Sequence, residues 1–222
     1  MMAIGPKLKW IKSNLEDKTY LIILLLFSIL LSFLIVKNFD TNFLLNTILI
    51  SSALYLFLIT LRDFFIKKYN NLSQNIAHFG FSLLILSIIF NNLFSTEIIT
   101  NLKVGETFKS ETTKIVFEGI NQKKEKNYQS IIGNFSIQNS KGKIENMSPE
   151  LRIYNQPNIV TSEADIKTTL ISDTFIVINL VQNQDYFNVR YQVKPFMIWI
   201  WISVVLISFG GLISFIKKKY EK

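Results

Sequence analysis

The residue of this chain whose type and position best suit chemistry is its one histidine, His78. It lies in an apolar segment, 76–94, long enough to cross a bilayer as a helix. An ionisable side chain in such a segment indicates function, because its burial in lipid is costly, and a neutral imidazole is a common axial ligand of haem iron. The residue alone leaves another interpretation open, a hydrogen bond across a helix interface with no cofactor. The small neighbours Ala77 and Gly80 would let a macrocycle or another helix approach the backbone.

Two polar motifs are the other candidate functional sites. Segment 161–168 combines two carboxylates with a lysine, which suits acid–base chemistry, although local pairing in water explains it better because no histidine or cysteine accompanies them. Segment 149–154 would present Arg152 and Tyr154 to a partner, or form a strand with one buried face. The chain has no cysteine, which excludes disulfides, thiolate metal sites and cysteine nucleophiles. No catalytic residue is assigned.

Four apolar segments position these residues, and each has about the 20 residues that a membrane-spanning helix needs. They are 20–36, 43–61, 76–94 and 195–216. The first is expected to be retained as an anchor, because no small-residue cleavage site follows it. Trp199 and Trp201 near one end of the fourth segment suit interface anchoring, with stacking on a haem edge as the alternative. Gly210 and Gly211 indicate close helix packing.

Between the third and fourth spans, the region 95–194 has the pattern of short β-strands. Runs rich in β-branched and aromatic residues alternate with turn-forming residues such as 121–123 and 139–142. The predicted strands are 114–120, 132–138, 150–154, 173–181 and 187–193. The expected fold is therefore a membrane α-helical protein with four transmembrane helices and one small all-β domain, a sandwich or open barrel.

The distribution of charge predicts the orientation in the membrane. Eleven of the 24 basic residues lie in the N-terminal segment 1–19, the loop 62–74 and the basic tail 217–222, against four acidic residues. Region 95–194 is nearly neutral, with 12 bases and 11 acids. The positive-inside rule therefore places both termini in the cytoplasm or matrix and the β-rich region 95–194 outside, in the periplasm or intermembrane space. That region lacks the cluster of basic residues on one face that is typical of nucleic-acid-binding proteins.

The ordered motifs of the chain resemble the C-terminal part of the CcmF-type cytochrome c haem lyases. The matching motifs are Ile4-Gly5-Pro6-Lys7-Leu8-Lys9-Trp10, Ala77-His78-Phe79-Gly80, Phe117-Glu118-Gly119, Asn127-Tyr128, Pro149-Glu150-Leu151-Arg152-Ile153-Tyr154, Thr161-Ser162-Glu163-Ala164-Asp165-Ile166, Asp173-Thr174-Phe175, Pro195-Phe196-Met197-Ile198-Trp199-Ile200-Trp201 and Gly210-Gly211-Leu212-Ile213-Ser214. Each motif alone is weak, whereas the ordered set over essentially the whole chain is specific.

The resemblance implies a role in cytochrome c maturation in a bacterial plasma membrane or the mitochondrial inner membrane. The family joins haem vinyls to the cysteines of apocytochrome c through thioether bonds. Its haem arrives from a membrane-anchored haem chaperone, and a thiol-handling assembly factor accompanies the apocytochrome. The family also holds haem b in the membrane, and by residue matching His78 would be an axial ligand of its iron.

Two departures from the family qualify this expectation. The Trp-rich haem-handling segment and the family's three other functional histidines are absent from the chain. The expected role is therefore the C-terminal subunit of a divided, multi-subunit haem lyase, not catalytically complete alone, whose second haem ligand lies on a partner with the missing elements. Met1 and Met2 just before the first motif favour a natural start over a piece of a longer chain. The alternative is a non-catalytic, membrane-tethered β-domain module for interaction or assembly.

Overall fold

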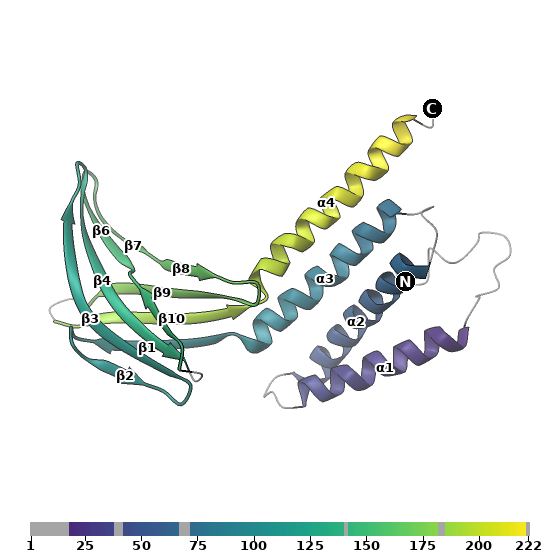
Figure 1. Cartoon of the computed structure of the whole chain (residues 1–222), viewed down its shortest axis with the longest axis horizontal. Coiled ribbons are helices and arrows are strands. Elements are labelled where there is room, and N and C mark those ends of the chain that lie inside the picture. The colour runs from purple at the N-terminus through teal and green to yellow at the C-terminus, as the bar shows by residue number, and fades with distance from the viewer. Residues whose placement is uncertain (1–17, 38–41, 67–71, 140–141, 182–184, 221–222) are drawn as a thin grey trace. The chain divides into compact units, whose positions relative to one another are not determined.

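The structure is a computed structural model that describes residues 18–37, 42–66, 72–139, 142–181 and 185–220 (Figure 1). Most of the N-terminal segment 1–19, including the first family motif, lies outside the described residues, as does part of the loop 62–74. The chain forms two compact units. The helical unit comprises residues 1–94 and 196–222, and the β unit comprises residues 95–195; each is described by itself.

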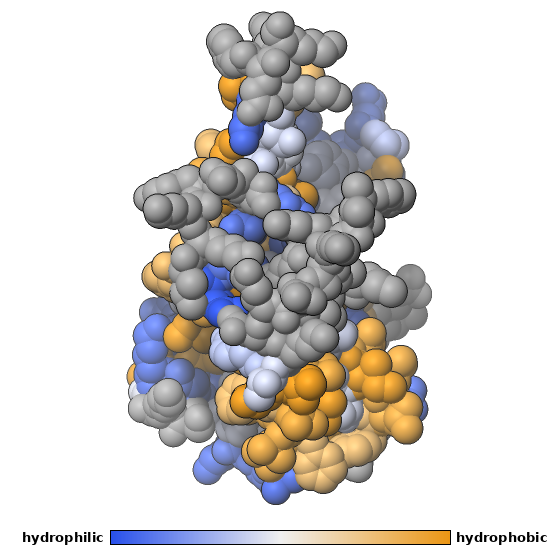
Figure 2. All heavy atoms as spheres, turned by 90° about the vertical axis from the view of Figure 1, so that its right-hand side faces the viewer, coloured by the Kyte–Doolittle hydropathy of each residue, from blue (hydrophilic) through white to orange (hydrophobic). Residues whose placement is uncertain are grey.

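The helical unit contains α1 (Lys18–Val36), α2 (Phe43–Ile66), α3 (Leu72–Phe94) and α4 (Met197–Tyr220). In the described part of the chain, four helices are long and apolar enough to cross a membrane, which makes this a multi-pass membrane protein. Many of their large apolar side chains are exposed, and Figure 2 shows apolar residues as orange areas on one face. Such helices suit a lipid environment, where apolar side chains face hydrocarbon.

The helices pack in sequence order, α1 on α2, α2 on α3 and α3 on α4. Buried Val36, Ile50 and Leu86 are members of one core that joins the first three helices. The contact between α3 and α4 is closest at Gly210, where an added β-carbon would lie 2.8 Å from the backbone of Ala77 and Ser73. Close backbone approach through small residues is a common packing mode of membrane helices.

Gly80 and Gly211 show which residues form this contact. A β-carbon on Gly80 would lie 3.0 Å from the backbone nitrogen of Ile207, so α3 contributes a glycine of its own. A β-carbon on Gly211 would meet nothing within 4 Å among the described residues. The sequence-based prediction of close packing is therefore confirmed for Gly210, whereas Gly211, about 100° further round the helix, makes no such contact with the described residues.

The β unit consists of two antiparallel sheets (Figure 1). Their strands are β1 (Thr96–Leu102), β2 (Thr107–Lys109), β3 (Thr113–Lys124), β4 (Tyr128–Asn139), β5 (Ile144–Met147), β6 (Glu150–Asn155), β7 (Asn158–Glu163), β8 (Asp165–Thr168), β9 (Ser172–Leu180) and β10 (Phe187–Pro195). One sheet has the order β1-β10-β9-β8, and the other has the order β2-β3-β4-β6-β7 with β5 paired to β4. The predicted β domain between the third and fourth helices is confirmed.

The core of the β unit lies between the two sheets. The rings of Phe117 and Phe135 stack with centroids 4.4 Å apart, and the Phe187 ring meets Phe117 edge-on at 5.5 Å. Buried Ile176 and Ile178 come from the opposite sheet, on alternate positions of β9. Alternation of buried and exposed residues is what a strand with one covered face requires. The two sheets therefore share a single apolar core.

The five predicted strands fall within β3, β4, β6, β9 and β10. The one exception is Val181, the last residue of the predicted strand 173–181, which follows the end of β9 at Leu180. The predicted turn at 121–123 is wrong, because these residues extend β3 and pair with 130–132 of β4. The chain turns later, where the amide of Glu125 donates to the carbonyl of Tyr128. Cross-strand pairing outweighs the local turn preference of polar residues here. The predicted turn at 139–142 is confirmed by the bond from the Gly142 amide to the Asn139 carbonyl and by the φ of +77° at Gly142.

The chain enters and leaves the β unit on neighbouring strands. β1 begins at Thr96, just after α3 ends at Phe94, and Thr96 pairs with Val193 of β10. Phe196, between β10 and α4, has a φ of +61°, which a bulky residue rarely adopts. Its ring packs 5.6 Å from that of Phe90 in α3, a contact that offsets part of this strain within the helical unit.

Candidate functional site

His78 lies in the second turn of α3 and is partly buried. The preceding residue, Ala77, contacts α4 beside Gly210. The following residue, Phe79, packs against α2, with its ring 5.1 Å from that of Phe57. Because successive residues are about 100° apart, His78 projects between these two contact faces, on the side of α3 shared with the exposed Phe81.

Across the described ranges, no hydrogen bond or ion pair joins the imidazole of His78 to another residue. The small residues Ala77 and Gly80, which suited either a macrocycle or a helix, are in contact with α4. Within the part of the chain described, no group of three or more His, Cys, Asp or Glu side chains is placed to hold a metal ion. His78 is the one histidine of this sequence, so a second imidazole ligand to a metal at His78 would come from outside it.

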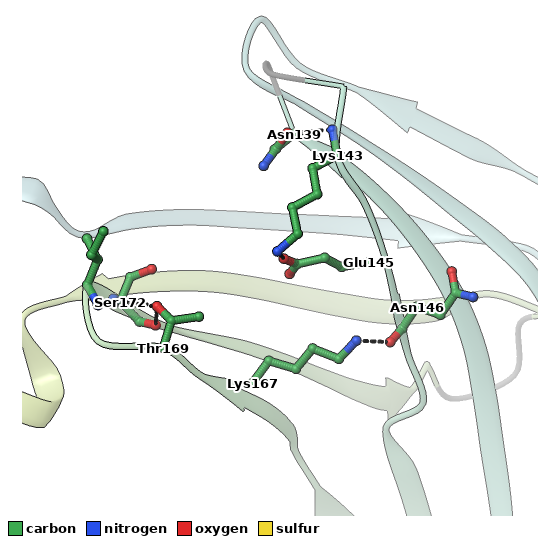
Figure 3. Close-up of polar contacts among 8 residues, drawn as sticks. Asn139, Lys143, Glu145, Asn146, Lys167, Thr169 and Ser172 are labelled. Atoms are coloured by element: carbon green, nitrogen blue, oxygen red, sulfur yellow. Dashed lines mark hydrogen bonds and ion pairs between the residues drawn. The ribbon is translucent and has the colours of Figure 1, made fainter.

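The polar motif 161–168 is divided between two edge strands, β7 and β8, and its charged groups have separate partners. The Asp165 carboxylate accepts a hydrogen bond of 2.6 Å from the amide of Ser148. Ser148 lies between β5 and β6, which belong to the other sheet. Lys167 donates to the carbonyl of Asn146 in β5, as Figure 3 shows. These bonds join the edge of one sheet to the other. The motif therefore connects the two sheets through hydrogen bonds. Its charged groups bond to separate backbone partners and do not form one acid–base site.

Arg152 is held in a network on β6. Its guanidinium donates to Glu150 at 3.1 Å, lies 3.8 Å from Glu163, and stands over the Tyr128 ring at 5.2 Å. The hydrogen bond from Arg152 lowers the pKa of the Glu150 carboxyl below its usual value, against the raising effect of burial. The Arg152 Nε is buried without a hydrogen-bond partner among the described residues. The network orients the guanidinium, and a role in binding a partner stays a prediction.

The effect of the Arg152 hydrogen bond on Glu150 predicts a pH-dependent contribution to stability. Since the folded-state pKa of Glu150 lies below its ordinary 4.5, the contribution is present above that pH and is lost as the pH falls further. We expect Glu150→Gln to lower the free energy of unfolding by roughly 0.2–1 kcal/mol at pH 7, as for partly exposed ion pairs. The urea midpoint of the β-sheet infrared signal measures this. The difference from the unaltered chain should shrink as the pH falls below 4.5, and a difference that stays constant in acid would contradict the assignment.

The two tryptophans at the start of α4 have different environments. Trp201 is largely exposed, whereas Trp199 is partly buried, and its carbonyl accepts a hydrogen bond from the Ser203 hydroxyl. An exposed Trp in the first turn of a membrane helix suits anchoring at the lipid interface. Stacking of either ring on a haem stays a prediction.

The fold and the site together define a four-helix membrane protein with an antiparallel β-sandwich inserted before its last helix. Residues 93–195 match the family model described as the CcmF C-terminal beta-sandwich. The match covers the whole β unit and the last residues of α3. Together with the relatives below, it confirms the resemblance: the chain is similar to the C-terminal part of the CcmF proteins.

Several curated relatives are cytochrome c-type biogenesis proteins named CcmF. That of Haemophilus influenzae is 24% identical over 239 residues, covering 100% of this chain and 37% of the relative. That of Escherichia coli is 21% identical, covering 100% of this chain and 36% of the relative. That of Pseudomonas fluorescens is 27% identical over 148 residues, or 67% of this chain and 22% of the relative. The chain thus spans well under half the length of these relatives.

A solved structure titled Cytochrome c Heme Lyase CcmF has the same fold. It superimposes with a TM-score of 0.69 over 95% of this chain and 37% of its own, at 16% sequence identity. The arrangement of three helices, a β unit and a further helix is therefore shared with the corresponding part of a much longer protein.

Proposed function

We propose that this chain supplies the C-terminal part of a cytochrome c haem lyase, the machinery that attaches haem covalently to apocytochrome c. The observation that carries the proposal is the fold shared over 95% of the chain with a solved haem lyase. The curated relatives, named for cytochrome c-type biogenesis, support the same assignment. In the proposed complex, this chain provides membrane helices and a β domain, and further parts of the lyase provide the remaining haem-handling groups.

Within this complex, His78 is proposed as one axial ligand of a haem b. A neutral imidazole suits haem iron, and His78 projects from α3 away from the Gly210 contact and away from the Phe57 ring. Because the chain has one histidine, a second imidazole must come from another polypeptide or another part of the protein. When bound, the haem would supply one-electron chemistry. The role of this chain is to hold the His78 imidazole at a fixed height in the membrane.

The proposed orientation places His78 on the cytoplasmic or matrix side of the membrane. It lies six residues after Leu72, or about 9 Å along the helix axis from the start of α3. The excess of lysine and arginine near the termini and the loop 62–74 favours that side for them. The β unit would then face the periplasm or the intermembrane space, where apocytochrome c, its thiol-handling factor and the haem chaperone are expected. The membrane would be a bacterial plasma membrane or a mitochondrial inner membrane.

The haem-ligand assignment is tested by replacing His78 with Ala in the purified complex and recording its reduced-minus-oxidised spectrum. We expect loss of the b-type absorbance, because the iron would lose an axial ligand and the sequence has no second histidine to replace it. Gln74→Ala, one turn earlier on α3, is the matched control and should keep the signal. His78→Gly with added imidazole should restore part of it. A full b-haem spectrum in the His78→Ala complex would refute the assignment.

A second function, a membrane-tethered interaction module without a cofactor, is favoured by one observation. The β unit has an apolar core of its own, so it can present a rigid surface to a partner independently of haem. The two functions are distinguished by co-purifying the chain with its partners. A stable complex without haem absorbance would favour the interaction module, and a b-type spectrum would favour the haem-ligand role.

A further inference from the structure

The turn between β8 and β9, residues 169–172, exposes two large aliphatic side chains. Leu170 is 69% exposed and Ile171 is 71% exposed. They occupy the two central positions of a tight hairpin turn, where Gly, Asn and Asp are usual. A pair of aliphatic residues gains nothing from such a position in water, which suggests that the turn meets an apolar medium.

The turn is held in one conformation by the hydroxyl of Thr169. The hydroxyl donates to the carbonyl of Ser172 at 2.8 Å and accepts from the amides of Ile171 and Ser172 at 3.3 and 3.0 Å. The amide of Thr169 also donates to the carbonyl of Ser172 at 3.0 Å. Figure 3 shows Thr169 and Ser172 facing each other at the end of the hairpin. Leu170 and Ile171 are therefore presented together by a well-braced turn.

Strand register places this turn at the end of the sheet that is joined to the membrane helices. Ser172 pairs with Pro195, and Met197, two residues beyond Pro195, begins α4. On the next strand, Thr96 pairs with Val193, and α3 ends two residues before Thr96. With neighbouring strands about 4.8 Å apart and residues at most 3.8 Å apart, Ser172 at the end of the turn lies within roughly 12 Å of the start of α4.

We propose that Leu170 and Ile171 insert into the interfacial layer of the lipid bilayer that α3 and α4 cross. The occupant is lipid because the chain itself brings this end of the sheet to the membrane boundary at both β1 and β10. Aliphatic side chains at that depth bury apolar area among headgroups and upper acyl chains. Lys194, at the same end of β10, holds its ammonium group 5.9 Å from the centre of the Phe175 ring and adds a positive charge at this end of the sheet. This proposal concerns membrane contact and does not depend on the haem-lyase function.

The opposite end of β9 supplies a matched control. Leu180 is also exposed, at 47%, and belongs to the same strand as Ser172. Eight residues separate the two positions, so Leu180 lies about 26 Å away along the strand, at the end remote from the helix connections. It pairs with Phe187, at the start of β10.

The absence of cysteine from the chain makes a site-specific test direct. Leu170→Cys, Ile171→Cys and Leu180→Cys variants of the full chain are labelled with a nitroxide and reconstituted into vesicles of phosphatidylcholine and phosphatidylglycerol. Electron paramagnetic resonance then compares collisions with oxygen, which concentrates in lipid, and with a water-soluble nickel chelate. We expect oxygen to dominate at positions 170 and 171, and the nickel chelate to dominate at position 180.

Two outcomes would overturn the proposal. One is equal, water-like accessibility at all three positions. The other is exclusion of both reagents at 170 and 171, which would mean that protein covers the turn. All three side chains are exposed, so the substitutions should leave the fold intact, and circular dichroism of each labelled variant verifies this. Failure here would leave the haem-ligand proposal untouched, because no haem signal enters the measurement.

Discussion

Replacing Gly210 with Leu is expected to separate α4 from α3, whereas the same replacement at Gly211 should leave the two helices in contact. At Gly210, the first added carbon would lie 2.8 Å from the nitrogen of Ala77 and the carbonyl oxygen of Ser73. These are backbone atoms of a helix, so they cannot rotate aside as a side chain could. At Gly211, an added carbon meets none of the described residues within 4 Å.

We expect the Gly210→Leu chain to lose about 3 kcal/mol, at the upper end of the usual cost of overpacking. For a chain of this size, that corresponds to a fall of roughly 6–12 °C in the thermal midpoint. Thermal unfolding of both variants in one detergent measures the effect, since the added hydrophobicity is identical. Equal midpoints for Gly210→Leu and Gly211→Leu would mean that the contact between α3 and α4 is absent. Because Ala77 precedes His78, loss of this contact should also weaken any haem binding there.

Phe117→Ala is expected to unfold much of the β unit. Phe117 is fully buried, stacks on Phe135 at 4.4 Å, and meets the edge of Phe187 from the other sheet at 5.5 Å. Removal of such a ring typically costs 3–5 kcal/mol, a large fraction of the 5–15 kcal/mol that stabilises an ordinary domain. The loss should be concentrated in the β unit, because the ring packs in that unit's core.

Amide hydrogen exchange of the full chain measures this effect element by element. We expect faster exchange in β3, β4 and β10 of the Phe117→Ala chain, with α2 and α3 little changed. Ile144→Ala is the control, because Ile144 is 60% exposed and an alanine there should alter stability by less than about 0.5 kcal/mol. Unchanged exchange in β3 and β4 of the Phe117→Ala chain would contradict the assignment of this stack as the centre of the core.

The main architecture could be predicted from the sequence because its signals are long or regular. Four apolar runs are hard to explain except as membrane helices, and alternation in 132–138 or 187–193 indicates strands with one covered face. The short strands β7 and β8 could not be predicted, because they are mostly polar, their apolar residues Ile159, Val160 and Ile166 are exposed, and their pairing is set by β6 and β9. The turn predicted at 121–123 failed for the same reason, since β4 pairs with residues that would favour a turn in isolation.

Candidate sites were predictable only where the residue type itself was informative. An imidazole in an apolar span identified His78 without a structure. By contrast, the partner of Asp165 is Ser148, 17 residues earlier, and no local pattern reveals such a bond. The difference between Gly210 and Gly211 depends on helix phase relative to α3, and the placement of Leu170 depends on the register of β9 with β10. Each of these is a long-range property of the fold.

The pairing of β1 with β10 has a mechanical consequence for the whole chain. These antiparallel strands are joined to α3 and α4 at the same end, through Thr96 and Pro195. A force that drew the two helices apart would load the ladder one pair at a time, beginning at Thr96 and Val193, so the strands would peel rather than shear. The close approach at Gly210 joins the same two helices and would share that load. Sideways strain in the membrane would thus be opposed both by the contact between α3 and α4 and by the first residue pairs of the β1–β10 ladder.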